Sequence, residues 1–230
     1  MSSPRPWTVF RPGPLTQRGH AVWTVDDDVP GLPGATRRMS VIRRPSGDLV
    51  FFNAVPVPEA SLEALKAIGR PAHLLVPNVF HALDVPAFIQ RLGVTAWVPD
   101  VSTAALSGRF PCRPVSAFPK DEGLRLFTVE GFKTKEIVLV AERTLFTGDL
   151  VTNSPHGKGA AGFLMRVVGF TGPEPKLPFP VRQRVQTDRQ AVKALLATLA
   201  ALELDRLVPT HGAVVDGDVA GSLRKVAAGI

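Results

Sequence analysis

Two short motifs in the second half of the chain each deliver a possible metal ligand at the end of an apolar stretch. Residues 144–147 run into Gly148 and Asp149, and residues 206–209 run through a threonine to His211. A carboxylate and a neutral imidazole at such loop mouths can both coordinate a metal ion. Each also has a structural alternative, since a turn aspartate can accept local backbone N–H groups and a lone histidine is often only hydrogen-bonded. The two residues therefore indicate a site only if the fold brings the two strand ends together.

A third motif, Pro-Asn-Val-Phe-His-Ala-Leu-Asp, follows a short apolar stretch in the first half and ends at Asp84. His81 and Asp84 are three residues apart, so that a helical turn would put them on one side of the chain. Together with Asp149 and His211 they would give two imidazoles and two carboxylates, a donor set that suits one Zn²⁺ or Fe²⁺ ion. In the alternative interpretation, His81 orients Asn78 or caps the helix, and Asp84 begins that helix, where the dipole favours a negative charge.

Polar residues close to these motifs are candidates for binding a substrate. Asn153 and His156 follow Asp149 within a few residues and can enter the same loop mouth. Asn78 or Asn153 could orient a substrate or polarise its carbonyl group. His156 is the remaining substrate-binding candidate.

A long irregular stretch, residues 151–187, separates Asp149 from the next predicted helix. Stretches of this length are usually functional lids or lack fixed structure. Residues 163–170, which include Phe163 and Phe170, are apolar enough to need cover. They could roof a pocket, fill the protein's own core, or form the interface of a homodimer.

Periodic apolar residues predict the elements that must position these motifs. Apolar stretches predict strands at residues 21–25, 38–43, 48–53, 73–76, 94–98, 124–129, 136–141, 144–146 and 206–208. Apolar residues at helical spacing predict helices at residues 58–68, 85–92, 188–202 and 219–227, with a further helical turn at residues 102–106. Each half of the chain thus offers a hairpin, a helix and a short strand that ends in a turn. This order predicts an α/β fold of two sheets, each covered by helices on its outer face, with ligands at the loops that leave the strands.

Length and composition favour one globular domain. The chain has 230 residues, of which 45% are hydrophobic and 20% charged. Residues 1–36 are rich in Pro and Gly and are predicted to form an arm that packs on a domain of residues 37–230. No apolar run approaches the ~20 residues of a membrane span, and the N-terminus carries no secretory signal. Because Cys112 is also the only cysteine, we expect a cytoplasmic protein without internal disulfides.

The formal net charge of +7 could favour nucleic acid as a partner. The basic residues are scattered, however, apart from two arginine pairs. These are Arg37, Arg38, Arg43 and Arg44. No basic stretch is interleaved with aromatic residues in the manner of single-strand binders. We therefore interpret the arginines as a solvated basic surface and do not expect a nucleic-acid partner.

The pairing of Gly148-Asp149 with the later His211-Gly212 resembles the metallo-β-lactamase superfamily. The resemblance spans roughly Met39 to the C-terminus and rests on short motifs. It implies an αββα sandwich of two similar halves, which agrees with the order of elements above. It also implies that Asp149 is a metal-bridging carboxylate and that His211 is the last metal ligand.

The sequence departs from the superfamily pattern at most of the other ligand positions. The superfamily carries His-x-His-x-Asp-His after the first half's short strand, where register puts Asn78 and Phe80 at the first two histidines. Ala82 and Leu83 then replace the aspartate and the third histidine. Phe132 stands where the superfamily has the histidine of a central Gly-His-Thr. Since phenylalanine has no lone pair to offer, we do not expect the superfamily's di-zinc centre.

The Pro-Asn-x-x-His pattern, with Asp149-Leu150 and Asn153 downstream, is similar to a divergent, uncharacterised branch of that superfamily. This resemblance implies an altered pocket and carries over no activity. The first hypothesis is a hydrolase of small esters, thioesters or lactones, in which Asp149, His211 and His81 hold one metal ion and its activated water. The alternative is a metal-free binding or scaffold protein that reuses the fold. A nuclease is the third and least favoured hypothesis, because superfamily nucleases depend on the intact di-zinc set that this sequence lacks.

Overall fold

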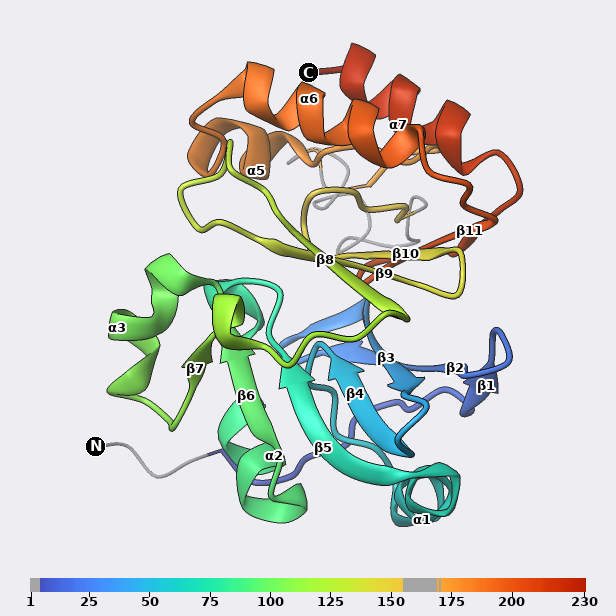
Figure 1. Cartoon of the computed structure of the whole chain (residues 1–230), viewed down its shortest axis with the longest axis vertical. Coiled ribbons are helices and arrows are strands. Elements are labelled where there is room, and N and C mark those ends of the chain that lie inside the picture. The colour runs from blue at the N-terminus through green and yellow to red at the C-terminus, as the bar shows by residue number, and fades with distance from the viewer. Residues whose placement is uncertain (1–4, 155–168, 170) are drawn as a thin grey trace.

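Two β-sheets lie face to face, with helices on the outer face of each, in the computed structural model of the chain (Figure 1). The structure describes residues 5–154, 169 and 171–230. The order of the layers, helix–sheet–sheet–helix, confirms the predicted αββα sandwich. It follows from central strands that are apolar on both faces and so need cover on both sides.

The N-terminal half of the chain forms the first sheet. Its seven strands are, in spatial order, β1 (Thr16–Gln17), β2 (Val22–Val29), β3 (Leu32–Arg43), β4 (Asp48–Phe52), β5 (Arg70–Leu75), β6 (Thr95–Val98) and β7 (Arg113–Pro114). The strands β1 to β4 are antiparallel neighbours, whereas β4 to β7 run parallel. The parallel strands are connected through α1 (Glu59–Ile68), α2 (Val85–Leu92) and α3 (Thr103–Ser107).

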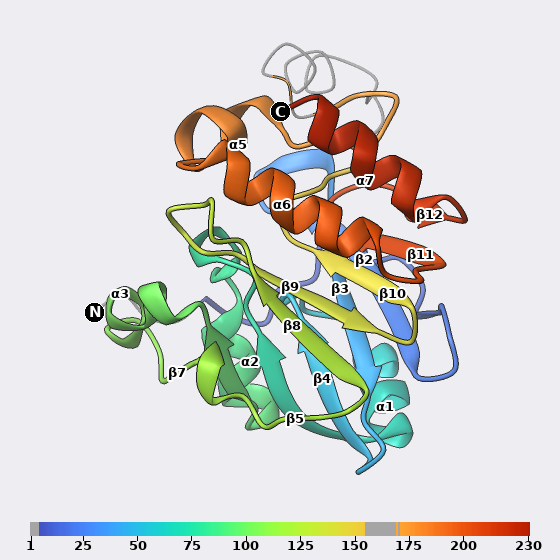
Figure 2. The same ribbon diagram turned by 45° about the horizontal axis from the view of Figure 1, so that its top comes forward.

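The C-terminal half forms the second sheet. Its five strands are, in spatial order, β12 (Val215–Asp216), β11 (Arg206–Pro209), β10 (Thr144–Thr147), β9 (Ile137–Ala141) and β8 (Leu124–Thr128). Its helices are α5 (Phe179–Arg184), α6 (Arg189–Ala200) and α7 (Val219–Ala228). Figure 2 shows α6 and α7 side by side over this sheet. Short 3₁₀ helices are η1 (Val79–His81), η2 (Asp100–Ser102) and η3 (Val115–Ala117).

Successive side chains of the central strands enter different apolar layers. In β4, Leu49 and Phe51 pack in the cluster that includes residues of α1 and α2, whereas Val50 and Phe52 pack between the two sheets. The ring of Phe52 lies against Phe146 of β10, with ring centroids 6.2 Å apart. A third cluster lies beneath α6 and α7. The period-two alternation of the strands therefore fills a buried layer on each face.

The predicted elements recur with small shifts at their ends. The bounds of α2 agree with the prediction, and α1 begins one residue later than predicted. The structure adds β1, β7 and β12, each two residues long, and α5, six residues long. Elements this short carry no period that a sequence pattern could reveal. The helix α5 lies inside the stretch that was predicted to be irregular.

The largest difference from the sequence prediction concerns the N-terminal region. The predicted division at residue 36 falls inside β3, because β2 and β3 form a long hairpin of the first sheet. Part of this hairpin is paired by charge. Asp26 faces Arg38 across it, and Asp27 faces Arg37. Opposite charges on facing positions stabilise a strand pair, but they produce none of the apolar alternation by which strands are predicted.

Among the described residues, 5–15 run as an arm along the first half. Trp7 anchors this arm, since its indole N–H donates to the carbonyl oxygen of Val57 at 2.9 Å. Its ring also packs on Phe88 of α2, with centroids 4.7 Å apart. None of the helices in the described parts of the chain has the length and apolar character of a membrane span.

Candidate metal centre

Three ligand-type side chains converge where loops from the two sheets meet. Asp149 and His211 follow β10 and β11, which are parallel neighbours, so that the carboxyl ends of the strands bring the two side chains together. His81 comes from the first half, at the end of η1. The Oδ1 atom of Asp149 lies 3.5 Å from Nε2 of His81 and 3.9 Å from Nε2 of His211. Within the described residues, these three form the one group of His, Cys, Asp or Glu side chains close enough together to hold a metal ion.

A side-chain amide fixes the tautomer of His81. Nδ2 of Asn53 donates to the carbonyl oxygen of Arg38 at 2.8 Å, so that its Oδ1 faces Nδ1 of His81 at 3.1 Å. Because an amide oxygen can only accept, Nδ1 of His81 must carry a proton. The lone pair of the neutral ring is therefore on Nε2, which faces Asp149.

A main-chain carbonyl fixes the tautomer of His211. Its Nδ1 lies 2.9 Å from the carbonyl oxygen of Thr36 in β3, so this nitrogen also carries the proton. The guanidinium group of Arg38 donates to carbonyl oxygens on both sides of the histidine, those of Pro209 and Gly212, at 3.0 and 2.8 Å. The loop is thus held from β3, and Nε2 of His211 keeps a lone pair directed toward the shared carboxylate.

Two buried polar side chains bind the second carboxylate oxygen and the backbone N–H of Asp149. Its Oδ2 accepts a hydrogen bond from Nδ2 of Asn78 at 2.9 Å, and its backbone N–H donates to the carboxylate of Glu136 at 2.7 Å. Both partners are buried. Burial, and then the negative charge of Asp149, raise the pKa of Glu136 to about 7, against the opposing effect of its backbone N–H donors. Since Oδ2 is occupied in this way, Asp149 presents Oδ1 to the two imidazoles.

The pKa values of the two imidazoles are shifted in opposite directions. Burial lowers the pKa of His81, but the charge of Asp149 and the hydrogen bond to it outweigh burial, so that the pKa is raised overall. Burial and the positive charge of His81 lower the pKa of His211. Burial raises the pKa of Asp149, yet both imidazoles together with Asn78 hold it well below its usual range. In the metal-free protein, the charge of Asp149 thus favours a proton on His81 over one on His211.

Of the four predicted metal ligands, Asp84 lies outside the cluster. Its buried carboxylate forms an ion pair with the guanidinium group of Arg37, and Nε of Arg5 lies 3.8 Å away. Asp84 is the N-cap residue of α2, although its side chain makes no capping hydrogen bond. Because His81 ends η1 and Asp84 precedes α2, the two do not share a helical turn, and the predicted four-ligand set is reduced to three.

The predicted substrate-binding asparagines make hydrogen bonds within the protein. Asn78 donates to the shared carboxylate and accepts at Oδ1 from a backbone N–H group at 2.9 Å. Asn153 donates to a backbone carbonyl next to the His211 loop at 3.0 Å. These contacts make both residues supports of the ligand loops. His156 lies outside the described residues, as do residues 163–170 apart from residue 169.

Four residues that the sequence analysis placed at superfamily ligand positions lie outside the candidate metal group. The side chains of Phe80 and Leu83 are 63% and 44% exposed, whereas Ala82 is buried in the first apolar cluster. Phe132 is fully buried in the cluster beneath α6 and α7. None of these four belongs to the group that could hold a metal ion.

Several groups that organise the site were not predicted from the sequence. Arg37 and Arg38 are only 6% and 5% exposed, so the interpretation of the arginines as a solvated surface is wrong for this pair. The signal that could have found them is the acidic run at residues 26–28, which faces them across the hairpin. Asn53 and Glu136 gave no distinct signal, because each is a single polar residue beside an apolar strand.

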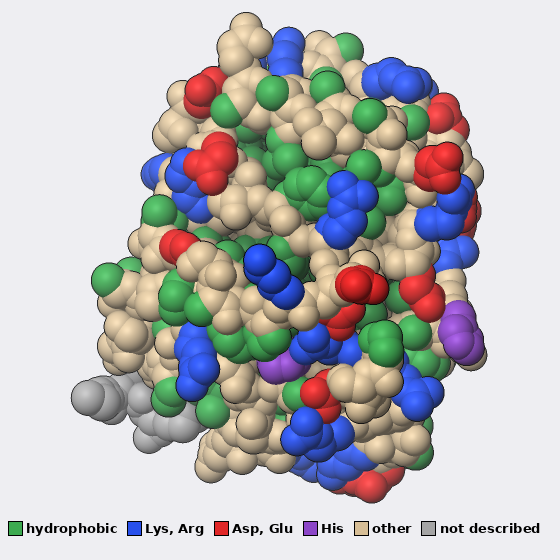
Figure 3. Space-filling view, viewed as in Figure 1, with side chains coloured by type: hydrophobic (Ala, Val, Ile, Leu, Met, Phe, Trp, Pro, Cys, Tyr) green, Lys and Arg blue, Asp and Glu red, His purple; other side chains and the backbone are tan. Residues whose placement is uncertain are grey.

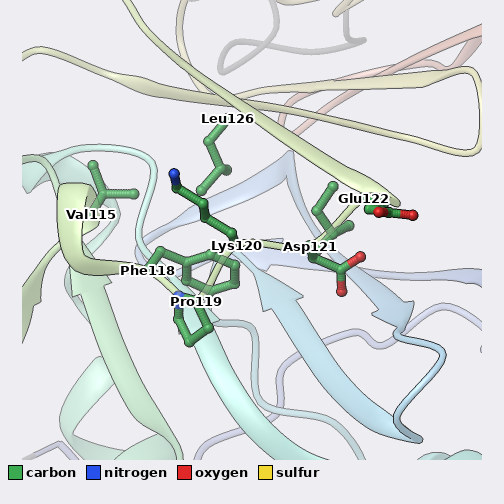
Figure 4. A pocket seen from close by; sticks show the side chains of 8 residues that line it. Val115, Phe118, Pro119, Lys120, Asp121, Glu122 and Leu126 are labelled. Carbon is green, nitrogen blue, oxygen red and sulfur yellow. The ribbon is translucent and has the colours of Figure 1, made fainter.

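A separate pocket of about 410 Å³ lies between η3 and the start of β8, with Phe118, Lys120 and Asp121 among its lining residues (Figure 4). The carboxylate of Asp121 is bound by Arg44 at 2.5 Å. No member of the metal group lines this pocket.

Figure 3 shows lysine and arginine side chains spread over one face of the molecule among acidic and apolar ones.

Comparisons with known proteins identify the fold. No family model matches the sequence, and no curated protein matches it. The solved structure of the DIM-1 metallo-β-lactamase exposed to ceftazidime has a TM-score of 0.65 at 12% identity, and the match covers 96% of this chain and 99% of that one. The metallo-β-lactamases from Hirschia baltica and Pontibacter korlensis have TM-scores of 0.64 and 0.61 at 14% identity, with 93% and 94% of this chain and 97% and 99% of theirs covered. The chain therefore has the metallo-β-lactamase fold, as its motifs indicated.

Proposed function

We propose that this metallo-β-lactamase-fold chain is a mononuclear metal-dependent hydrolase of small esters, thioesters or lactones. The supporting observation is the direction of three acceptor atoms. Nε2 of His81 and Nε2 of His211 both face Oδ1 of Asp149, while both Nδ1 atoms are held in the protonated form by acceptors. Lone pairs that converge on a carboxylate repel one another unless a cation lies between them.

The donor set fits a transition-metal ion. Two neutral imidazole nitrogens and one carboxylate oxygen, with further positions left open, are typical of catalytic zinc and of non-haem Fe²⁺ sites. The partners of the ligands fit as well, since metal-binding histidines usually donate their other ring N–H to an acceptor. A metal ion held by His81, Asp149 and His211 would lower the pKa of a bound water molecule to ~7 and polarise a substrate carbonyl.

A single ion is favoured over two. Asn78 already donates to Oδ2 of Asp149, so that one oxygen of this carboxylate remains for a metal. Phe132 and Phe80 supply no ligand atoms at the positions where the superfamily has histidines. The protein's own contribution to the reaction is then to orient the two imidazoles and to keep Oδ1 of Asp149 turned toward them.

Exposed apolar side chains support a substrate with an apolar group beside its carbonyl. Phe80 and Leu83 flank His81 in the chain, and both are largely open to solvent. Large apolar side chains that remain exposed beside a polar site are typical of ligand-binding surfaces. Substrate recognition of this kind does not require Asn78 or Asn153, whose side chains are engaged within the protein.

The decisive experiment is elemental analysis of protein purified without chelators or an affinity tag. We expect close to one equivalent of a transition metal, and less than about a tenth of an equivalent would overturn the proposal. His81→Ala and His211→Ala should each remove the metal, whereas His20→Ala, at an exposed position outside the group, should retain it. Hydrolysis of chromogenic esters, thioesters and lactones by the loaded protein then identifies the substrate class.

One observation favours the alternative of a metal-free binding protein. The charge of Asp149 raises the pKa of His81, so a proton can take the position between them without a metal ion. A metal content near zero, combined with full folding and no hydrolysis, would support that function instead.

A further inference from the structure

Glu136 lies between the loops that carry the candidate ligands. It directly precedes β9, and its side chain is fully buried. Its Oε1 accepts the backbone N–H groups of Gly148 and Leu150, at 2.9 and 3.1 Å. Its Oε2 accepts the backbone N–H of Asp149 at 2.7 Å and Nδ2 of Asn78 at 3.3 Å.

These four donors use the full capacity of the carboxylate, which has about four lone-pair sites. All four come from the two ligand loops: three from residues 148–150 and one from Asn78. Because Asn78 also donates to Oδ2 of Asp149, the three side chains form a chain of contacts that ends at the shared ligand. The backbone N–H of Ile137 donates to the carbonyl oxygen of Pro77 at 2.8 Å, which ties the start of β9 to the loop of Asn78 beside Glu136.

Close packing around Gly148 brings both loops against the Glu136 side chain. A Cβ atom at Gly148 would lie 2.8 Å from Cβ of Pro77 and 3.0 Å from Cδ of Glu136. The loop that carries Asp149 is therefore pressed against both the first-half loop and the buried carboxylate. A buried carboxylate is costly unless its hydrogen bonds are complete, and here the donors of both loops complete them.

We propose that Glu136 is a positioning residue that fixes Asp149 as a metal ligand by gathering the N–H groups of both ligand loops. Glu136 is too deeply buried to touch a substrate, and it acts through Asp149 and Asn78. The inference rests on the proposed function for its effect on metal affinity, but the positioning itself applies equally to the metal-free protein.

The test is Glu136→Gln. A glutamine of the same size turns one acceptor oxygen into an NH₂ group, which then faces N–H donors. We expect the dissociation constant for Zn²⁺, measured by competition with a chromophoric chelator, to rise about 10- to 100-fold. The visible absorption of the Co²⁺-loaded protein should also change, since the orientation of the ligand carboxylate changes. A merely structural role would not move this spectrum.

The matched control is Asp84→Asn, which neutralises another buried carboxylate near His81 that is paired with Arg37. We expect this variant to lose thermal stability but to keep the zinc affinity and the Co²⁺ spectrum. An affinity for Glu136→Gln within about threefold of the parent protein, with an unchanged spectrum, would overturn the proposal.

Hydrogen exchange separates this proposal from the metal hypothesis. In metal-free protein, the amides of Gly148, Asp149 and Leu150 should exchange about tenfold faster in Glu136→Gln, but not in Asp84→Asn. If the parent protein binds no metal, the proposed function fails, and this exchange result alone decides the role of Glu136. If Glu136→Gln does not fold, Asn78→Ala removes the link to Asp149 instead, and an unchanged zinc affinity there would overturn the proposal.

Discussion

The two imidazoles of the metal centre are held by different kinds of partner. His211 donates to a main-chain carbonyl, that of Thr36, and its loop is clamped by Arg38. His81 donates to a side chain, that of Asn53, whose backbone is in the left-handed region with φ of 68°. Both rings thus carry their proton on Nδ1. In His211 the backbone of β3 holds that proton, and in His81 the side chain of one asparagine holds it. The first arrangement is insensitive to the side chain of the partner, and the second depends on it.

The largest effect should come from Asp149, which both imidazoles share. Asp149→Asn removes the only carboxylate of the candidate group in the described parts of the chain, and it should weaken Zn²⁺ binding by at least about a hundredfold, beyond the loss expected for a supporting residue. Competition with a chromophoric chelator measures the change. Asp84→Asn serves as the control, because that carboxylate lies outside the group. An equal loss in both variants would show that buried charge, and not ligation, governs affinity.

Asn53→Gly tests the dependence of His81 on a side chain. Glycine accepts the left-handed backbone, so the variant removes the acceptor without adding strain. We expect zinc affinity to fall about 10- to 100-fold and the His81 ring to lose its fixed tautomer, as seen in imidazole ¹⁵N shifts. Thr36→Ala keeps the carbonyl that holds His211 and should leave affinity unchanged. A comparable loss in Thr36→Ala would contradict the contrast between the two imidazoles.

Gly212→Ala tests the backbone that holds His211. Gly212 and Gly217 both have φ of 93°, but a Cβ at Gly212 would lie 2.1 Å from the carbonyl oxygen of Asn153, whereas one at Gly217 meets nothing within 4 Å. Both substitutions should cost about 1–2 kcal/mol of unfolding free energy from backbone strain. The clash should add about 1 kcal/mol or more for Gly212→Ala alone. Urea denaturation of metal-free protein measures the difference in unfolding free energy between the two variants. Equal losses of unfolding free energy would mean that the loop moves to accommodate the Cβ atom at no cost.

The smallest effect is a difference in pH dependence. In metal-free protein, the NMR signal of His81 should titrate above, and that of His211 below, the ordinary pKa of about 6.5. The raised pKa of His81 contributes stability that is fully present below pH ~6.5 and is lost as the pH rises through the raised value. The lowered pKa of His211 contributes stability that is present above pH ~6.5 and is lost as the pH falls through the lowered value. If both rings titrated above about 6.5, or both below it, the predicted opposite shifts of the two pKa values would be wrong.

The sequence was informative where apolar periodicity decides the structure. The two layers and most of the strands follow from apolar stretches that end in polar loops. The convergence of Asp149 with His211 was implied by the resemblance of their two motifs to the superfamily pattern. His81 could also be singled out, because it completes the Pro-Asn-x-x-His pattern and lies three residues before Asp84. The same pattern misplaced Asp84, since three residues of spacing suggest a common helical turn and the chain instead changes from η1 to α2 there.

The supporting residues could not be predicted, because their partners are distant in the chain. Asn53 meets His81 across 28 positions, and Glu136 meets Asn78 across 58. A single polar residue next to an apolar strand has the same local pattern whether it supports a site or ends a strand. The burial of Arg38 likewise depends on carbonyl groups more than 170 positions away.

The strand β3 has a consequence for how the two halves depend on each other. The backbone N–H of Arg38 binds the carbonyl oxygen of Thr210 at 2.7 Å, and its own carbonyl oxygen binds Asn53. A strand of the first sheet thus organises the His211 loop of the second. Docking of the halves and assembly of the candidate metal centre are therefore coupled, because His81 comes from the first half and Asp149 and His211 come from the second. A bound ion would therefore stabilise the docked sandwich as a whole, and not only the loops that hold the ion.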